Sequence, residues 1–291
     1  MSKIPNKQFR ESLFFKESVK SHHGTYTINV TPTLAESWLE WNDGNRRVTN
    51  RHVINIAKQM VSGNWMLNGQ CLIMGSNGKL LDGQHRLHAV IECGKTILMD
   101  VRFGIDPETF KTIDEGKKRS PGDVLSIVGT KDANNVAAAA RFVMSYDYGN
   151  SKTVQKGSYG GLAPSNSDVL KWVKENPSIE EDVMTGASLY TASSRLVLSR
   201  SMFAAFIYIA KRVDEADAES FFGRLATGHN LSVGTISRLR DRLIRSKLDK
   251  SNSLPTGVRN QLVAKYWNAW RDGKEVKQIK LPKTTNQIKF K

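Results

Sequence analysis

The chain has little that would cross-link it or hold it in a membrane. Only 2 of its 291 residues are cysteines, Cys71 and Cys93, and they do not form a Cys-x-x-Cys pair. A disulfide framework is therefore excluded, and because both lie in apolar surroundings we expect buried, reduced thiols. No apolar run reaches the length that spans a bilayer, and residues 1–23 lack the apolar core of a signal peptide. These absences predict a cytoplasmic protein with no membrane partner.

Several well-known catalytic signatures are also missing. The sequence has no His-Glu-x-x-His pair, no Walker loop, no Ser/His/Asp signature and no internal repeat. His85 and His88 lie three residues apart on a predicted helix, but a zinc site would need further ligands that the sequence does not offer. Any chemistry must therefore use another arrangement of residues.

Positive charge is the strongest feature of the composition. Lys and Arg number 43 against 28 Asp and Glu, which gives a net charge of +15 and a pI near 9.8. From residue 231 onward the chain holds 15 Lys and Arg but only 4 Asp and Glu. This predicts a polyanionic partner, most simply DNA. The alternative is a solvated basic surface without a partner.

The central stretch of the chain predicts a strand, a glycine turn and a helix. The apolar run Cys71–Met74 is followed by an Asn-Gly turn and a short return strand, Lys79–Leu81. After Asp82 and Gly83 the apolar spacing becomes helical from Gln84, with Gly94 as the expected stop.

Polar residues crowd the first turn of that helix, where unpaired N–H groups and the helix dipole attract anions. Gly83 would let a ligand approach the backbone, Arg86 would fork onto a phosphate, and His85 would donate to an oxygen. Asp82 would cap the helix, bind a phosphate-bound Mg²⁺ or act as a base. The alternative is a capped helix with a solvated first turn.

The string Asp82–Arg86 resembles the central motif of the ParB/sulfiredoxin fold. ParB-type proteins carry Gly-Glu-Arg-Arg-x-x-Ala and grip a nucleoside triphosphate, and Gly83, Arg86 and Ala89 match that pattern. Sulfiredoxins carry Gly-Gly-Cys-His-Arg, but Gln84 stands here in place of the reactive Cys, which excludes sulfinic-acid repair. The motif is also similar to Asp-Gly-His-His-Arg of a free-serine kinase of this fold. The full string is similar to one in phage and mobile-element proteins of the ParB-like group.

The resemblance covers about Thr25 to Leu125 and implies the fold class and the site. It implies an α+β ParB/sulfiredoxin-like domain in residues 1–130, followed by an all-α basic domain with a cationic tail in residues 131–291. The nucleotide would be ATP or CTP with Mg²⁺ bound through Asp82. Its site would contain Asp82, His85 and Arg86 as reacting groups, with Gly83 and Gln84 as further contacts. A phage-encoded protein would act in the host cytoplasm.

Two basic turns are further phosphate-binding candidates. Arg46, beside Arg47, lies in a segment similar to the one that precedes the motif in ParB-like domains, where an Arg closes over the ligand. Lys117 and Arg119 lie in a second glycine-centred turn that resembles the phage group, and both could clamp phosphates. Ordinary solvated basic turns are the alternative.

The second half shows helical spacing only, after a Gly/Ser/Lys-rich linker at residues 149–164. Arg238, Arg242 and Arg245 share one face of a helix expected at residues 233–248, with Trp267 and Trp270 in the next helix. A basic face with aromatics suits contacts to a phosphate backbone, although Arg often solvates a helix and Trp is more often core.

Three functions remain open from the sequence. The first is a nucleotide-binding, DNA-associated ParB-like factor. The second is a phosphoryl-transfer enzyme, NTPase or nuclease that uses Asp82. The third is a regulator that binds a host protein through its basic surface. A homodimer is compatible with each of them.

Overall fold

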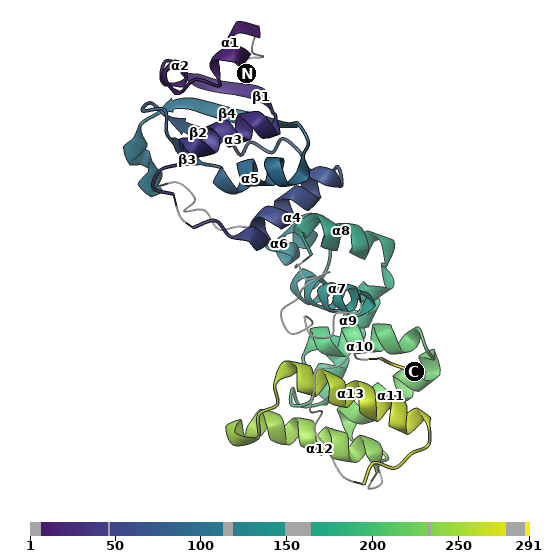
Figure 1. Ribbon diagram of the computed structural model, residues 1–291. Helices are drawn as coiled ribbons and strands as arrows, with labels where there is room; N and C mark the ends of the chain where they lie inside the picture. The colour runs from purple at the N-terminus through teal and green to yellow at the C-terminus, as the bar shows by residue number, and fades with distance from the viewer. Residues whose placement is uncertain (1–6, 46, 113–118, 149–163, 232–233, 278–288) are drawn as a thin grey trace. The chain divides into compact units, whose positions relative to one another are not determined.

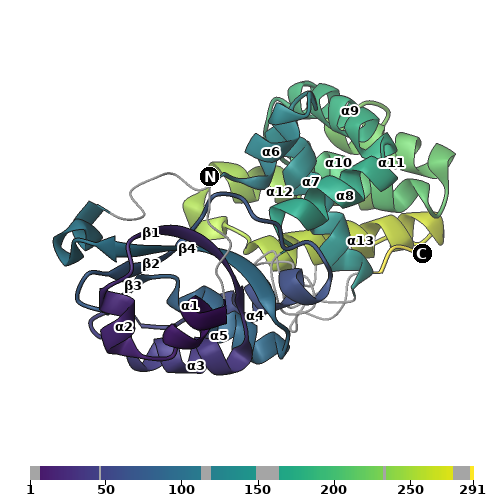
Figure 2. The same ribbon diagram turned by 90° about the horizontal axis from the view of Figure 1, so that it is seen from above.

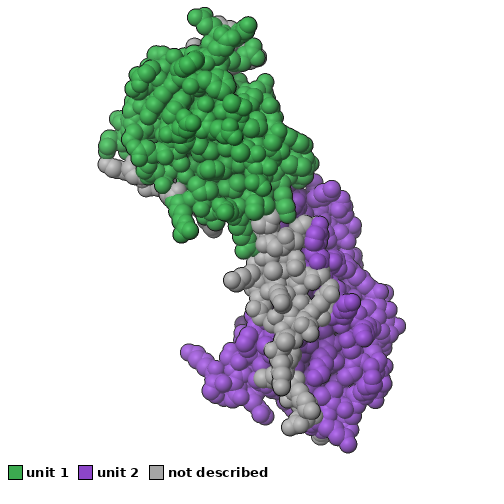
Figure 3. Space-filling model, viewed as in Figure 1, with its two compact units in different colours: residues 1–117 green, residues 118–291 purple. Residues whose placement is uncertain are grey.

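The computed structural model describes residues 7–45, 47–112, 119–148, 164–231, 234–277 and 289–291. The chain divides into two compact units, residues 1–117 and 118–291 (Figure 3). All the described strands lie in the first unit, and the described regular elements of the second are helices (Figure 1). The predicted α+β class is therefore confirmed.

The first unit contains one sheet with helices around it (Figure 1). The two strands predicted around the Asn-Gly turn are present as β2 and β3, each shifted by one residue from its expected bounds. Its elements are α1 (Lys7–Ser12), α2 (Lys16–Lys20), β1 (Gly24–Val30), α3 (Pro32–Glu40), α4 (Asn50–Val61), β2 (Leu72–Gly75), β3 (Leu80–Asp82), α5 (Gln84–Cys93), β4 (Ile97–Ile105) and the 3₁₀ turn η1 (Pro107–Thr112).

The sheet has the order β1-β4-β2-β3, with β4 antiparallel to β1 and parallel to β2. Residues on β4 alternate, so that Met99 and Val101 are buried whereas Leu98 is exposed. Helices α3 and α4 both pack on α5, and the three lie on one side of the sheet (Figures 1 and 2). This places the start of α5 directly after the edge strand β3, which pairs with β2.

The second unit is a helical bundle with its own core. Its elements are α6 (Pro121–Ile127), α7 (Ala133–Asp147), α8 (Asn166–Glu175), α9 (Ser178–Ala192), α10 (Arg200–Lys211), α11 (Glu215–Thr227), α12 (Thr235–Leu248), the 3₁₀ turn η3 (Lys250–Asn252) and α13 (Thr256–Arg271). The division between the units lies before α6, and not after residue 130, because Leu125 of α6 packs in the core of the second unit.

Helix α9 was not expected from the sequence. Small and polar residues interrupt its apolar stripe, and Gly186 is one of its buried positions. A Cβ there would lie 2.7 Å from the carbonyl oxygen of Arg200 and 3.0 Å from the backbone nitrogen of Ala204, so the backbones of α9 and α10 pack directly against each other. This close packing stabilises α9, and a search for apolar residues at helical spacing does not detect it.

Two smaller expectations need correction. The sequence predicts Ser167 or Asp168 as the cap of helix α8, but Ser165 caps it. The Ser165 Oγ accepts from the Asp168 N–H at 3.2 Å, while the Asp168 carboxylate accepts from the Ser165 N–H at 2.9 Å. The two cysteines are only half-buried: Cys71 lies just ahead of β2, and Cys93 lies in the last turn of α5.

Candidate functional site

Gly83 makes the turn between β3 and α5, as its position in the sequence predicts. Its φ of +109° lies in the left-handed region that glycine tolerates. A Cβ at this position would lie 2.2 Å from Cδ2 of Leu72, so a side chain of β2 makes a close approach to Gly83. Asp82 makes no capping bond to α5, contrary to one of the roles expected for it.

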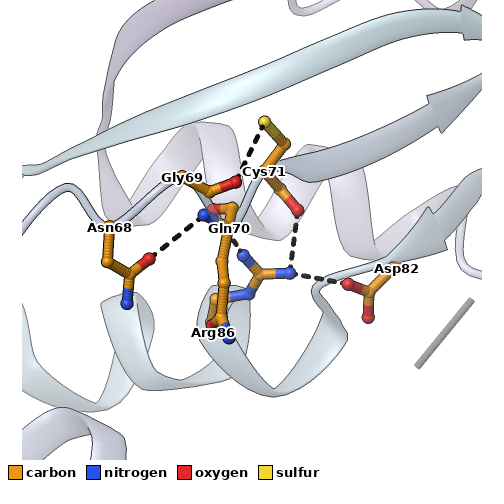
Figure 4. Close-up of polar contacts among 6 residues, drawn as sticks. All are labelled: Asn68, Gly69, Gln70, Cys71, Asp82 and Arg86. Atoms are coloured by element: carbon orange, nitrogen blue, oxygen red, sulfur yellow. Dashed lines mark hydrogen bonds and ion pairs between the residues drawn. The ribbon is translucent and has the colours of Figure 1, made fainter. Parts of the chain in front are cut away.

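The guanidinium of Arg86 donates its hydrogen bonds to other residues of the first unit. Its Nη1 donates to the carbonyl oxygen of Gln70 at 2.9 Å, and its Nη2 donates to that of Cys71 at 2.9 Å. Nη2 also donates to Oδ2 of Asp82 at 2.7 Å (Figure 4). The Arg86 side chain is only 12% exposed. The sequence predicts that Arg86 forks onto a phosphate; in the structure its guanidinium binds protein oxygens and ties the segment ahead of β2 to the end of β3 and to α5.

Gln84 and His85 bind a second segment of the same unit. Gln84 is 5% exposed, and its Oε1 accepts from Nδ2 of Asn42 at 3.1 Å. His85 is 9% exposed, and its Nε2 accepts from the backbone N–H of Thr49 at 3.1 Å. This bond assigns the proton of the neutral ring to Nδ1. The two side chains therefore anchor the segment between α3 and α4 to α5.

Asp82 keeps some access to solvent. Its side chain is 28% exposed, and the bond to Arg86 uses Oδ2. Among the described residues no cluster of three or more His, Cys, Asp or Glu side chains is present. A Mg²⁺ ion at Asp82 would consequently take its remaining ligands from phosphate oxygens and water, which is a common arrangement for this ion.

Two neighbouring titratable groups are in their neutral forms at pH 7. Burial raises the pKa of the Cys71 thiol, and nearby Asp100 raises it further. Burial lowers the pKa of His88, on the same helix as His85. Cys71 is therefore a thiol and not a reactive thiolate, although its carbonyl oxygen takes part in binding Arg86.

The other predicted phosphate ligands are not all within the described residues. Arg46 and Lys117 lie outside them. Arg119 belongs to the second unit, where it is exposed and precedes α6. Its carbonyl oxygen accepts from Nδ2 of Asn166 at 2.9 Å. Of these three predicted ligands, only Arg119 therefore lies within the described residues.

Helix α12 carries the three arginines predicted to bind DNA, above a buried face that includes Leu239 and Leu243. Arg238 faces the carboxylate of Glu275 at 3.5 Å, and Nη1 of Arg242 donates to the carbonyl oxygen of Asn252 at 3.0 Å. Arg245 is exposed and makes no ion pair within the described part of the chain. Only this last side chain is fully free for a phosphate.

The aromatic residues of α13 are core residues. Trp267 is 0% exposed and lies among other aromatic rings, including Phe221 at a centroid distance of 5.4 Å. Trp270 is half-buried against the same core. The Trp267 ring is therefore not available for stacking on bases unless part of the unit unfolds.

Sequence reasoning missed the partners that hold the corner together. Asn42, Thr49 and Gln70 bind Gln84, His85 and Arg86, yet they come from segments 15 or more positions away along the chain. Their residue types are common in loops, so no local signal marks them.

Comparisons with protein families, with curated proteins and with solved structures gave no match. No described helix is both long and apolar enough to cross a bilayer. The functional argument therefore depends on the charges and contacts described above.

Proposed function

We propose that this chain is a ParB-like DNA-binding protein that holds the phosphate backbone through its helical unit. The observation that carries the proposal is the excess of cations from residue 231 onward, 15 against 4 carboxylates. The exposed cations Arg245, Lys247, Lys250 and Lys265 make no ion pair within the described residues. Free cations on a folded surface release counterions when they meet a phosphate backbone, which favours binding.

The contacts on α12 rank its arginines as DNA ligands. Arg238 is already compensated by Glu275, and moving it to a phosphate would leave that carboxylate unpaired. Arg245 has no such cost, because its exposed guanidinium has no carboxylate partner among the described residues. We therefore infer that Arg245, with the neighbouring Lys247, contributes more to DNA affinity than Arg238.

Duplex affinity should fall steeply as salt rises, and Arg245→Gln should lower both the affinity and this dependence. The loss of one phosphate contact reduces the slope of log K against log salt by about one. Fluorescence anisotropy with a labelled duplex at several salt concentrations measures both quantities. The matched control is Lys131→Gln, which removes an exposed cation outside the basic segment. Affinity that does not change with salt, or an equal loss in the control, would contradict the proposal.

A second candidate function concerns the corner at residues 82–86. We infer a nucleotide phosphate with Mg²⁺ there, because Oδ1 of Asp82 makes no hydrogen bond to a described residue and Asp82 stands beside the N-terminus of α5. A phosphate would have to compete for Arg86 with Asp82 and two carbonyl oxygens. Phosphoryl transfer or phosphodiester cleavage with Asp82 as the base would use the same site.

Mg²⁺ with ATP or CTP should raise the melting temperature of the protein, since a ligand that binds only the native state stabilises it. Asp82→Asn should remove the part of the shift that depends on Mg²⁺. Glu36→Gln, an exposed carboxylate on α3, is the control and should leave the shift unchanged. A panel of nucleotides measured by thermal unfolding with and without Mg²⁺ makes the comparison. No shift with any nucleotide, or a full shift in Asp82→Asn, would overturn this inference.

A further inference from the structure

A small cavity in the second unit is lined by three cationic side chains. Its volume is about 90 Å³, and it lies where the connection between α9 and α10 meets the end of α12 and the start of α13. Its charged and polar lining residues are Tyr190, Arg195, Ser199, Ser246, Lys247 and Arg259. Among the described residues, no carboxylate lines it.

The three cations lack the partners that usually neutralise such a cluster. Within the described residues, none of Arg195, Lys247 and Arg259 forms an ion pair, whereas Arg200 nearby faces Asp132 at 3.9 Å. Arg259 donates from Nη2 to the carbonyl oxygen of Leu254 at 3.3 Å, which orients its guanidinium without removing its charge. Like charges that share a cavity repel one another, and a bound anion would reverse that cost.

An unusual backbone turn brings Arg195 to this cavity. Ser194 and Arg195 are consecutive residues with φ of +53° and +65°, a left-handed conformation that is unfavourable for residues other than glycine. Bonds from the Ser194 N–H to the Thr191 carbonyl at 3.0 Å and from the Arg195 N–H to the Tyr190 carbonyl at 2.9 Å hold the turn. Strained turns of this kind occur often at ligand sites.

The lining also includes the first residues around a helix N-terminus. Ser199 caps the twelve-residue helix α10, and its Oγ accepts from the Met202 N–H at 3.3 Å. The positive end of the α10 dipole therefore adds to the charge of the three side chains. Two independent features, a cationic cavity and the start of a helix, favour the same kind of ligand.

We propose that this cavity binds a single phosphate group. Its volume holds about three water molecules at roughly 30 Å³ each. It is far below the roughly 300 Å³ at which sites for drug-sized organic ligands begin. Arginine binds phosphate through two parallel N–H groups and lysine binds it as a point charge, so the pair Arg195 and Lys247 suits a tetrahedral oxyanion. The phosphate could be free or terminal on a small molecule, or it could belong to a nucleic-acid backbone.

The test compares two double variants of the full-length protein. The lining variant, Arg195→Gln/Lys247→Gln, removes two exposed cationic side chains that line the cavity. The charge-matched variant, Lys250→Gln/Lys265→Gln, removes two exposed cationic side chains outside it. Isothermal titration with inorganic phosphate, at constant ionic strength set with chloride, measures the affinity. We expect the lining variant to lose at least about tenfold in affinity. The charge-matched variant should bind phosphate as the unchanged protein does.

A second arm identifies where the phosphate comes from. Arg195→Gln alone leaves Arg245 and Lys247 in place for DNA, and Lys131→Gln is its control. If the phosphate belongs to a nucleic-acid backbone, Arg195→Gln should lose more duplex affinity than Lys131→Gln. If the phosphate is free or on a small molecule, these two single variants should bind duplex equally while Arg195→Gln still loses affinity for inorganic phosphate. The proposal is overturned if the unchanged protein does not bind phosphate, or if both double variants bind it equally. Failure of duplex binding alone would overturn the proposed function and not this site.

Discussion

Gly83→Ala should lower the free energy of unfolding of the first unit by about 3 kcal/mol. Alanine at a φ of +109° costs about 1–2 kcal/mol in backbone strain. Its Cβ would also lie 2.2 Å from Cδ2 of Leu72, a side chain that is fully buried in β2. Forcing a methyl group into such a packed position adds about 1–3 kcal/mol.

Urea denaturation of the variant, followed by far-UV circular dichroism, measures this loss. Gly94→Ala is a matched control at the other end of the same helix, because its φ is +64° but a Cβ there would meet nothing within 4 Å. The control should therefore show the backbone strain alone, about 1 kcal/mol. Equal losses in the two variants would mean that Leu72 does not occupy the space beside Gly83.

Arg86→Met should destabilise the first unit by about 3 kcal/mol or more. The substitution keeps most of the aliphatic stem but removes the donors to two carbonyl oxygens and to the Asp82 carboxylate. Breaking a mostly buried ion pair leaves an uncompensated charge, which typically costs about 3–5 kcal/mol. A loss of this size would lower the melting temperature by on the order of 10 °C.

Thermal and urea unfolding of Arg86→Met test this expectation. Arg102→Met is the control, since Arg102 is exposed on β4 of the same sheet and its replacement should change stability by no more than about 0.5 kcal/mol. The variant Arg86→Lys adds a graded comparison, because lysine keeps the charge but loses the planar fork. If Arg86→Met is as stable as its control, the guanidinium does not hold the strands to α5.

These two expectations give the central motif a structural role that local pattern did not reveal. The sequence predicted the turn at Gly83, the start of α5 at Gln84 and the stop at Gly94, and the structure confirms all three. It also predicted that Arg86 would fork onto a phosphate, whereas in the structure the guanidinium binds protein oxygens. Which oxygens that fork would bind depended on Gln70 and Cys71, and nothing in the motif itself identifies them.

The nucleotide and DNA assignments stay predictions. The resemblance to ParB-like proteins places a phosphate at the corner, but Arg86, Gln84 and His85 already have partners in the first unit. The proposed DNA binding does not depend on that motif, because it is argued from the excess of Lys and Arg in the carboxyl-terminal segment. The duplex and nucleotide experiments can therefore fail separately.

By itself the sequence determined the mixed α+β class, the positions of the strands, the glycine turns and the concentration of positive charge after residue 230. These properties depend on short-range periodicity, on backbone conformations that glycine adopts easily and on counting charges. The tertiary structure alone decided that Leu72 fills the space at Gly83, that Arg86 is satisfied internally and that Arg195, Lys247 and Arg259 share a cavity. Each of these depends on contacts between residues far apart in the chain, where packing and not local pattern selects the partner.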